Sequence, residues 1–159
     1  DQLKQIIPEK YNFKTGTDEK SYNIPYWGTR RYFVAPENME EIKAVSRFAK
    51  EEGIPLFVLG NGSNLLVADD GMDGIVLQIY KNYSGIEVRG NELIVKAGTL
   101  LSSTSRAALN EELTGFEFAG GIPGTFGGAV VMNAGAYGGE MVQVLKEVTV
   151  LTKEGEIKL

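Results

Sequence analysis

The sequence predicts an α+β fold made of two small α+β subdomains, and three observations lead to this prediction. One strongly amphipathic helix lies between the apolar runs 31–35 and 55–59, which is the pattern of a parallel β-α-β unit. From residue 86 onward, alternating runs are separated by short turns, as in antiparallel hairpins. The change of pattern predicts subdomains at residues 31–80 and 81–159, preceded by an atypical N-terminal segment, residues 1–30.

The elements of the first predicted subdomain follow from capping residues and periodicity. Asn38 can cap a helix over Asn38–Glu52, because Glu41 stands three residues further on, as in a capping box. Pro55–Leu59 is apolar throughout, which predicts a strand buried on both faces. Gly74–Tyr80 alternates and is predicted as a further strand. The apolar face of the helix is formed by Met39, Ile42, Val45, Phe48 and Ala49.

The second predicted subdomain begins with a hairpin. Ile86–Arg89 and Glu92–Lys96 alternate around Gly90-Asn91, a favoured turn sequence. Thr99 is predicted to cap a helix over Leu100–Leu113. The other expected features are a glycine-rich segment at 115–139, a helical turn at 140–145, a hairpin of 148–151 with 156–159, and a short N-terminal helix at 1–7.

The composition excludes several kinds of site and partner. The 159 residues include 16 basic and 21 acidic ones, a net charge of −5, which argues against a nucleic-acid or anionic-membrane surface. The chain has no Cys and no His, so it contains no disulfide, no Cys or His metal site, no Cys nucleophile and no His-dependent triad. No apolar run approaches the roughly 18 residues of a membrane-spanning helix, and no signal peptide is recognisable. We therefore expect no nucleic-acid partner, no membrane insertion and no metal.

Glycine is in excess, at 20 residues or about 13%, against roughly 7% in an average protein. A first glycine segment, Leu59–Leu65, follows a predicted strand and can present backbone N–H groups to an anion such as phosphate. It is neither a nucleotide P-loop, since no Gly-Lys-Ser/Thr follows, nor a Rossmann fingerprint, since Leu65 occupies the third glycine position. A plain tight turn is the alternative. The segment consists of Leu59, Gly60, Asn61, Gly62, Ser63, Asn64 and Leu65.

A second glycine segment, Gly115–Gly139, carries nine glycines among apolar residues. Because a disordered linker is polar, this composition indicates buried backbone lying against something flat or large. A close-packed backbone crossing without a ligand is the alternative. Two such segments in one small chain suggest a dinucleotide cofactor, with one loop at the pyrophosphate and the other along the ribityl chain and aromatic ring.

Three strings then resemble one known family: Leu59–Val67, Ala97-Gly98, and Gly121–Gly138, which reads GIPGTFGGAVVMNAGAYG. They are similar to the corresponding parts of UDP-N-acetylenolpyruvoylglucosamine reductases (UDP-N-acetylmuramate dehydrogenases). The resemblance covers residues 31–159 and is weak over 1–30. It implies the α+β FAD-binding fold of the vanillyl-alcohol oxidase / p-cresol methylhydroxylase type.

The resemblance also implies an activity and a set of site residues. Members of the family are cytoplasmic enzymes of peptidoglycan precursor synthesis. They use NADPH to reduce a noncovalent FAD. The reduced flavin then passes hydride to the enolpyruvyl double bond of a UDP-sugar, and the product is UDP-N-acetylmuramate. The first glycine segment would contact the pyrophosphate. The rest of the cofactor would lie along Ala119, Gly121, Ile122, Gly124, Gly127 and Ala129. The family's catalytic Arg, Ser and Glu have no match here and are expected beyond Leu159, in a substrate domain absent from this chain; the chain alone is expected to be inactive.

One departure from the family keeps alternatives open. In Tyr22–Gly28, Trp27 stands where the family has the first of two adjacent glycines. A bulky indole cannot replace a glycine against a cofactor. The alternatives are a non-catalytic relative that binds FAD or a nucleotide, and an oxidase of the same fold. Asn133 and Tyr137 are candidates to face the flavin or the substrate, without an assigned role.

Overall fold

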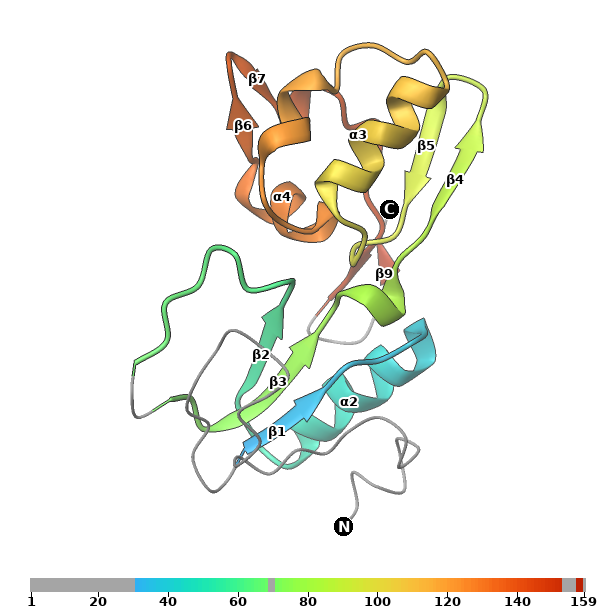
Figure 1. The fold of residues 1–159 in the computed structure, drawn as a ribbon. Coiled ribbons are helices and arrows are strands. Elements are labelled where there is room, and N and C mark those ends of the chain that lie inside the picture. The colour runs from blue at the N-terminus through green and yellow to red at the C-terminus, as the bar shows by residue number, and fades with distance from the viewer. Residues whose placement is uncertain (1–30, 69–70, 153–156, 159) are drawn as a thin grey trace.

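The computed structural model describes residues 31–68, 71–152 and 157–158. The expectations for residues 1–7, for Tyr22–Gly28 with Trp27, and for the turn at Lys153–Gly155 lie outside these described residues. Within them, helices and strands are mixed as predicted. Figure 1 shows a lower part containing the sheet β1–β3 and helix α2, and an upper part containing α3, α4 and two hairpins.

The lower part is a parallel sheet covered by one helix. β1 (Arg31–Val34), β2 (Leu56–Leu59) and β3 (Gly74–Gln78) all run parallel, in the order β1-β3-β2. α2 (Met39–Glu51) begins as predicted, because the Asn38 side chain accepts a hydrogen bond from the Glu41 amide at 3.0 Å and donates one to its carboxylate at 2.9 Å. The parallel β-α-β unit is thus confirmed.

The predicted burial of the strand at residues 55–59 is wrong, and the strand order explains why. β2 lies at the sheet edge, with Val58 69% exposed and Phe57 39% exposed, so the prediction of a strand buried on both faces fails. β3 lies in the middle, and all five of its residues are buried. A uniformly apolar run indicates a strand, but it does not show whether that strand lies in the middle or at the edge of its sheet.

Two apolar layers hold this sheet. On the face covered by α2, side chains of the helix meet alternate residues of β1 and β3; the buried members are Val34, Ile42, Val45, Ala49, Ile75 and Leu77. On the opposite face, Phe33, Val76 and Leu59 form a smaller cluster. Leu59 therefore anchors the end of β2 in a core, directly before the first glycine segment.

The connection from β2 to β3 is long because both strands point the same way. The chain must return from the carboxyl end of β2 to the amino end of β3, a crossover that usually contains a helix. Residues 60–68, the described start of this connection, contain neither helix nor strand. In Figure 1 the connection swings out beyond the edge strand β2.

The upper part is built around α3 (Leu101–Asn110) and a second apolar core. The predicted hairpin is confirmed as β4 (Ile86–Arg89) and β5 (Glu92–Val95). The core is formed by side chains of α3, the 3₁₀ helix η2 (Glu117–Gly121), α4 (Phe126–Met132) and the start of the 3₁₀ helix η3 (Met141–Gln143). Its buried members are Leu101, Phe118, Ala119, Ala129 and Met141. The remaining elements are the 3₁₀ helix η1 (Lys81–Tyr83), and the pairs β6 (Gly135–Ala136) with β7 (Gly139–Glu140) and β8 (Val150–Leu151) with β9 (Ile157–Lys158).

Two expectations for the helices of this part are wrong. Thr99 does not cap α3, whose N-cap is Leu100 without a side-chain hydrogen bond. The Thr99 hydroxyl instead donates to the Gly85 carbonyl at 3.1 Å and accepts from the Gly85 amide at 2.9 Å. α3 also ends at Asn110, three residues before the predicted end, and Glu112 then adopts a left-handed φ of 56°.

Candidate cofactor site

The two glycine segments meet in the structure. The Ser63 hydroxyl donates a hydrogen bond to the Pro123 carbonyl at 3.1 Å, across 60 residues of sequence. Gly60 lies so close to Thr125 that a Cβ on residue 60 would stand 2.5 Å from the Thr125 Oγ1. A Cβ on Gly124 would in turn lie 3.6 Å from the Ser63 Oγ. The predicted cofactor loops therefore form one junction between the lower and upper parts of the molecule.

The first glycine segment offers backbone donors to an anion. Gly62 has a left-handed φ of 79°, which turns the chain sharply after Asn61. The Ser63 amide donates to the Asn61 Oδ1 at 3.4 Å. Within the described residues, the amides of Asn61, Gly62 and Asn64 have no hydrogen-bond partner. Successive N–H groups around a left-handed turn form a concavity suited to phosphate.

The ends of this segment differ in environment. Leu59 is 8% exposed and belongs to the core, whereas Leu65 is 44% exposed. The Ser63 hydroxyl proton is engaged by the Pro123 carbonyl in this arrangement. The backbone amides, rather than this hydroxyl, are thus the available donors.

The predicted residues of the second glycine segment divide into packed and open positions. Ala119 and Ala129 are buried in the upper core, and Ile122 packs against it. Gly127 is forced by packing, since a Cβ there would lie 2.7 Å from the Ala97 Cβ. Gly121, at the exposed end of η2, has no atom within 4 Å of its Cβ position. Packing with the described residues therefore gives no reason for glycine at position 121.

Helix α4 was not predicted, and its first turn is already satisfied by the protein. The Phe126 amide donates to the Thr99 carbonyl at 2.7 Å, and the Gly127 amide to the Ala97 carbonyl at 2.8 Å. The Gly128 amide donates to the Thr125 hydroxyl oxygen, the N-cap, at 3.4 Å. Since these three donors are used, the first turn of α4 offers no free backbone donor of residues 126–128 to an anion at the junction.

Thr125 is the residue at this junction that the sequence analysis missed. It is 3% exposed, caps α4 and faces Gly60. Thr is a favoured N-cap residue, and the turn-forming Pro123-Gly124 precedes it. That local signal could have indicated a helix start, but nothing local indicates the contact with Gly60.

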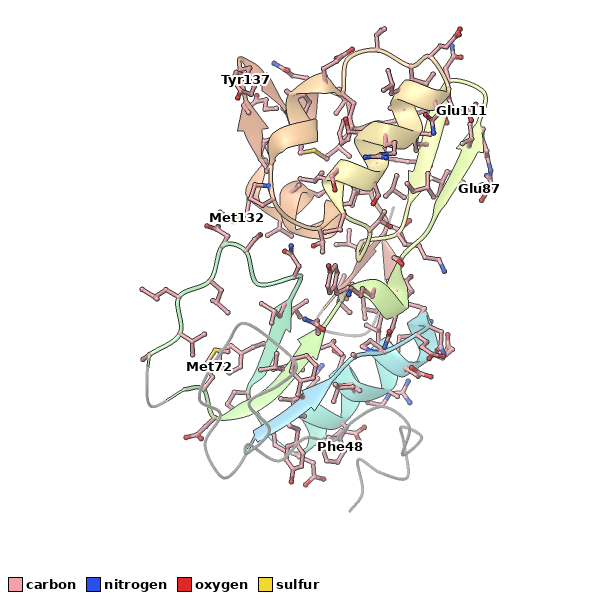
Figure 2. All side chains as sticks on the ribbon, in the orientation of Figure 1. Phe48, Met72, Glu87, Glu111, Met132 and Tyr137 are labelled. Atoms are coloured by element: carbon pink, nitrogen blue, oxygen red, sulfur yellow. The ribbon has the colours of Figure 1, made fainter. Side chains whose placement is uncertain are left out.

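Asn133 and Tyr137 turn out to have different surroundings. Asn133 has a left-handed φ of 44° at the end of α4; its side chain accepts from the Val142 amide and donates to the Glu140 carboxylate, both at 2.9 Å. Its amide group is thus used to hold the chain after α4. Tyr137 is 99% exposed. It lies at the tip of the β6–β7 hairpin, where Figure 2 labels it.

Two exposed ion pairs and one shallow depression of the described part of the chain lie away from the junction. The Glu87–Arg89 and Glu92–Lys146 ion pairs are exposed and include no residue of the first glycine segment or of the junction. A shallow depression of about 510 Å³ also excludes every predicted cofactor residue. We find no group of three or more acidic residues that could hold a metal ion among the residues described, and no helix there is long and apolar enough to cross a membrane. The depression is lined by Gly115, Glu117, Phe118, Tyr137, Gly138 and Gly139.

Comparisons with known proteins give one matching domain family and several relatives that share one name. Residues 31–159 match the FAD binding domain family. A UDP-N-acetylenolpyruvoylglucosamine reductase of Alkaliphilus oremlandii is 42% identical over 156 residues, which are 98% of this chain and 51% of that protein. Its counterpart in Syntrophomonas wolfei is 47% identical over 152 residues, 96% of this chain and 50% of that protein.

A solved structure agrees with the curated relatives. The crystal structure of UDP-N-acetylenolpyruvylglucosamine reductase from Thermus caldophilus has a TM-score of 0.65 and 36% sequence identity, and the match covers 79% of this chain and 44% of that chain. The chain spans about half the length of the curated relatives it matches.

Proposed function

Because this chain belongs to the FAD binding domain family, we propose that it is the FAD-binding part of an NADPH-dependent reductase that converts UDP-N-acetylglucosamine enolpyruvate to UDP-N-acetylmuramate. The observation that carries the proposal is the meeting of the two glycine segments at Gly60 and Thr125. Their sequences are the strings by which the chain resembles these reductases, and the fold expected from that resemblance is confirmed.

The residues present fit the pyrophosphate of FAD. The free backbone N–H groups of Asn61, Gly62 and Asn64 supply neutral donors. At the turn, Gly62 has no side chain that would stand between the backbone and a phosphate. We infer that Gly60 and Ser63 hold this loop in place through their contacts with Thr125 and the Pro123 carbonyl, and that Leu59 and Leu65 flank it. When bound, FAD supplies hydride-transfer chemistry that no side chain provides.

The second glycine segment is proposed to bind the remainder of FAD. No described atom lies within 4 Å of the Gly121 Cβ position, so a flat group can approach the backbone there, and Gly124 would border that group beside Ser63. Ala119, Ile122, Gly127 and Ala129 support that surface from the upper core. In this proposal these four residues act through packing rather than through hydrogen bonds.

We propose that residues 31–80 and 81–159 are two FAD-binding subdomains. The separate apolar cores support this division, because the buried members of the lower cores end at Leu77 and those of the upper core begin at Leu101. Leu151 packs on the lower core, so the end of the chain returns to the first subdomain. FAD would lie at the junction that joins the two.

The proposal also assigns the chemistry that this chain does not supply. The relatives are about twice as long as the part matched, and we propose that their remaining half provides the UDP-sugar site and the catalytic Arg, Ser and Glu. We further propose that the whole protein works in the cytoplasm, where NADPH and nucleotide sugars are available.

The test is a visible absorption spectrum of the purified protein before and after FAD is added and the excess removed by desalting. A retained flavin spectrum that denaturation releases is the expected result. Gly62→Ala should abolish retention, because a Cβ at φ 79° strains the loop. Gly53→Ala is the matched control, since Gly53 has a similar φ of 64° with nothing within 4 Å of its Cβ position.

The reaction itself is tested in the full-length protein. NADPH consumption that depends on the enolpyruvyl UDP-sugar is expected. Flavin retention without that turnover would favour the non-catalytic relative, and oxygen consumption with another small molecule would favour the oxidase. A protein that retains no flavin at any FAD concentration would overturn the proposal.

A further inference from the structure

The contact between Gly60 and Thr125 is closer than ordinary packing. An added Cβ on residue 60 would stand 2.5 Å from the Thr125 Oγ1 and 3.4 Å from its Cγ2. Real Cβ atoms do not approach other atoms to 2.5 Å, so only glycine lets the backbone at position 60 reach this side chain. The threonine hydroxyl and methyl thus both face the start of the first glycine segment.

Thr125 is itself held from several sides. It is 3% exposed, and its backbone forms an antiparallel bridge with Leu100. Its hydroxyl oxygen accepts from the Gly128 amide, and its carbonyl accepts from the Ala129 amide at 2.9 Å. A side chain fixed in this way has little freedom to yield, so it can define where the opposing backbone lies.

The first glycine segment touches the upper part at two points, three residues apart. Gly60 meets Thr125, and Ser63 donates to the Pro123 carbonyl at 3.1 Å. Between these points lie Asn61 and Gly62, whose amides are free among the described residues. The two contacts therefore fix both ends of the short span that carries the proposed phosphate donors.

We propose that Thr125 is a positioning residue for the phosphate-binding loop. By holding Gly60, it sets the direction of the Asn61 and Gly62 amides before the ligand arrives. Donors fixed in advance lose less entropy on binding, which raises affinity without a new contact. This inference rests on the proposed function, because FAD is the ligand whose pyrophosphate the loop would hold.

Three substitutions in the full-length protein test this role. Thr125→Val removes the hydroxyl and keeps the size, and we expect it to raise the Kd for FAD at least about tenfold. Thr125→Ser keeps the hydroxyl and should bind FAD within about threefold of wild type. Thr104→Val is the matched control: Thr104 is 1% exposed and donates to the Leu100 carbonyl within α3. It should leave the Kd within about twofold, although it too loses one hydrogen bond.

The melting temperature of each apoprotein separates positioning from stability. A merely structural Thr125 would lower the melting temperature and leave the Kd of the folded apoprotein unchanged. Equal effects of Thr125→Val and Thr104→Val on the Kd would overturn the inference. If Thr125→Val does not fold, the pair Gly60→Ala and Thr125→Ala provides an independent test.

That pair tests the contact directly. Gly60→Ala should weaken FAD binding at least about tenfold in the wild-type background, and less than about twofold in the Thr125→Ala background, where the opposing atoms are gone. Equal losses in both backgrounds would exclude the contact as the cause. A wild-type protein that binds no FAD would refute the proposed function, whereas wild-type binding with unaltered variants would refute this inference alone.

Discussion

Gly121→Ala is the substitution that best distinguishes a glycine kept for a cofactor from one kept for packing. Gly121 ends η2, is exposed, and has no atom within 4 Å of its Cβ position. Its φ lies outside the left-handed region, so alanine can adopt its backbone conformation. The protein alone therefore tolerates alanine at this position.

Two different magnitudes follow from this geometry. Because the new methyl meets no protein atom, the free energy of unfolding of the apoprotein should change by less than about 0.5 kcal/mol. If FAD lies against Gly121, the same methyl overpacks the interface, which costs about 1–3 kcal/mol. Since about 1.4 kcal/mol is a tenfold change in affinity, the Kd for FAD should rise roughly 5- to 150-fold.

The assay pairs urea unfolding of the apoprotein with a titration of FAD followed by quenching of flavin fluorescence. Gly127→Ala is the control, since its Cβ would lie 2.7 Å from the Ala97 Cβ and should destabilise the apoprotein itself by about 1–3 kcal/mol. An unchanged Kd for Gly121→Ala, with normal binding by the wild type, would refute the placement of FAD against this residue.

Three further predictions concern the structure around the site. Gly98→Ala should lower the free energy of unfolding by about 3 kcal/mol, because its Cβ would stand 2.2 Å from the Tyr80 carbonyl oxygen. A lower midpoint of urea unfolding is the expected readout. Asn133→Ala should cost about 1–3 kcal/mol by the same measurement, since it frees two hydrogen-bond partners; equal stability would show that neither bond contributes. The hydrogen bond and charge of Arg89 hold the pKa of the Glu87 carboxyl below its ordinary 4.5. The pair therefore stabilises the folded state above pH 4.5, and this stabilisation is lost as the pH falls through the lower pKa of the folded state. An NMR titration of Glu87 checks this, and both high salt, which screens the charge of Arg89, and Arg89→Gln, which removes it, should move the pKa upward toward its ordinary value.

The parts of the fold that the sequence predicts well depend on neighbours a few residues apart. α2 is an example, because Asn38 and Glu41 cap it within one turn. α4 was missed because Gly127 and Gly128 lower helix propensity, and the reason for Gly127 is contact with Ala97, thirty residues earlier. Local patterns contain no information about such a contact.

The same distinction applies to the candidate site. Each glycine segment was recognisable from its own residues, and their sequences carried the family resemblance. Their meeting through Gly60 and Thr125 was not predictable, since it depends on how the two parts of the molecule pack. The burial of β2 was predicted wrongly for a related reason, because the order of strands in a sheet is set by the whole chain.

The strand order β1-β3-β2 has a consequence for how the chain folds during synthesis. β1 and β2 come first from the ribosome but are not neighbours, and the strand that joins them begins only at Gly74. Until then, both strands present edges with unpaired backbone groups, which are prone to association with other chains. The three-stranded sheet therefore cannot form until β3 is available to pair with both β1 and β2. A nascent chain paused before Gly74 is the species on which chaperone binding or aggregation should concentrate.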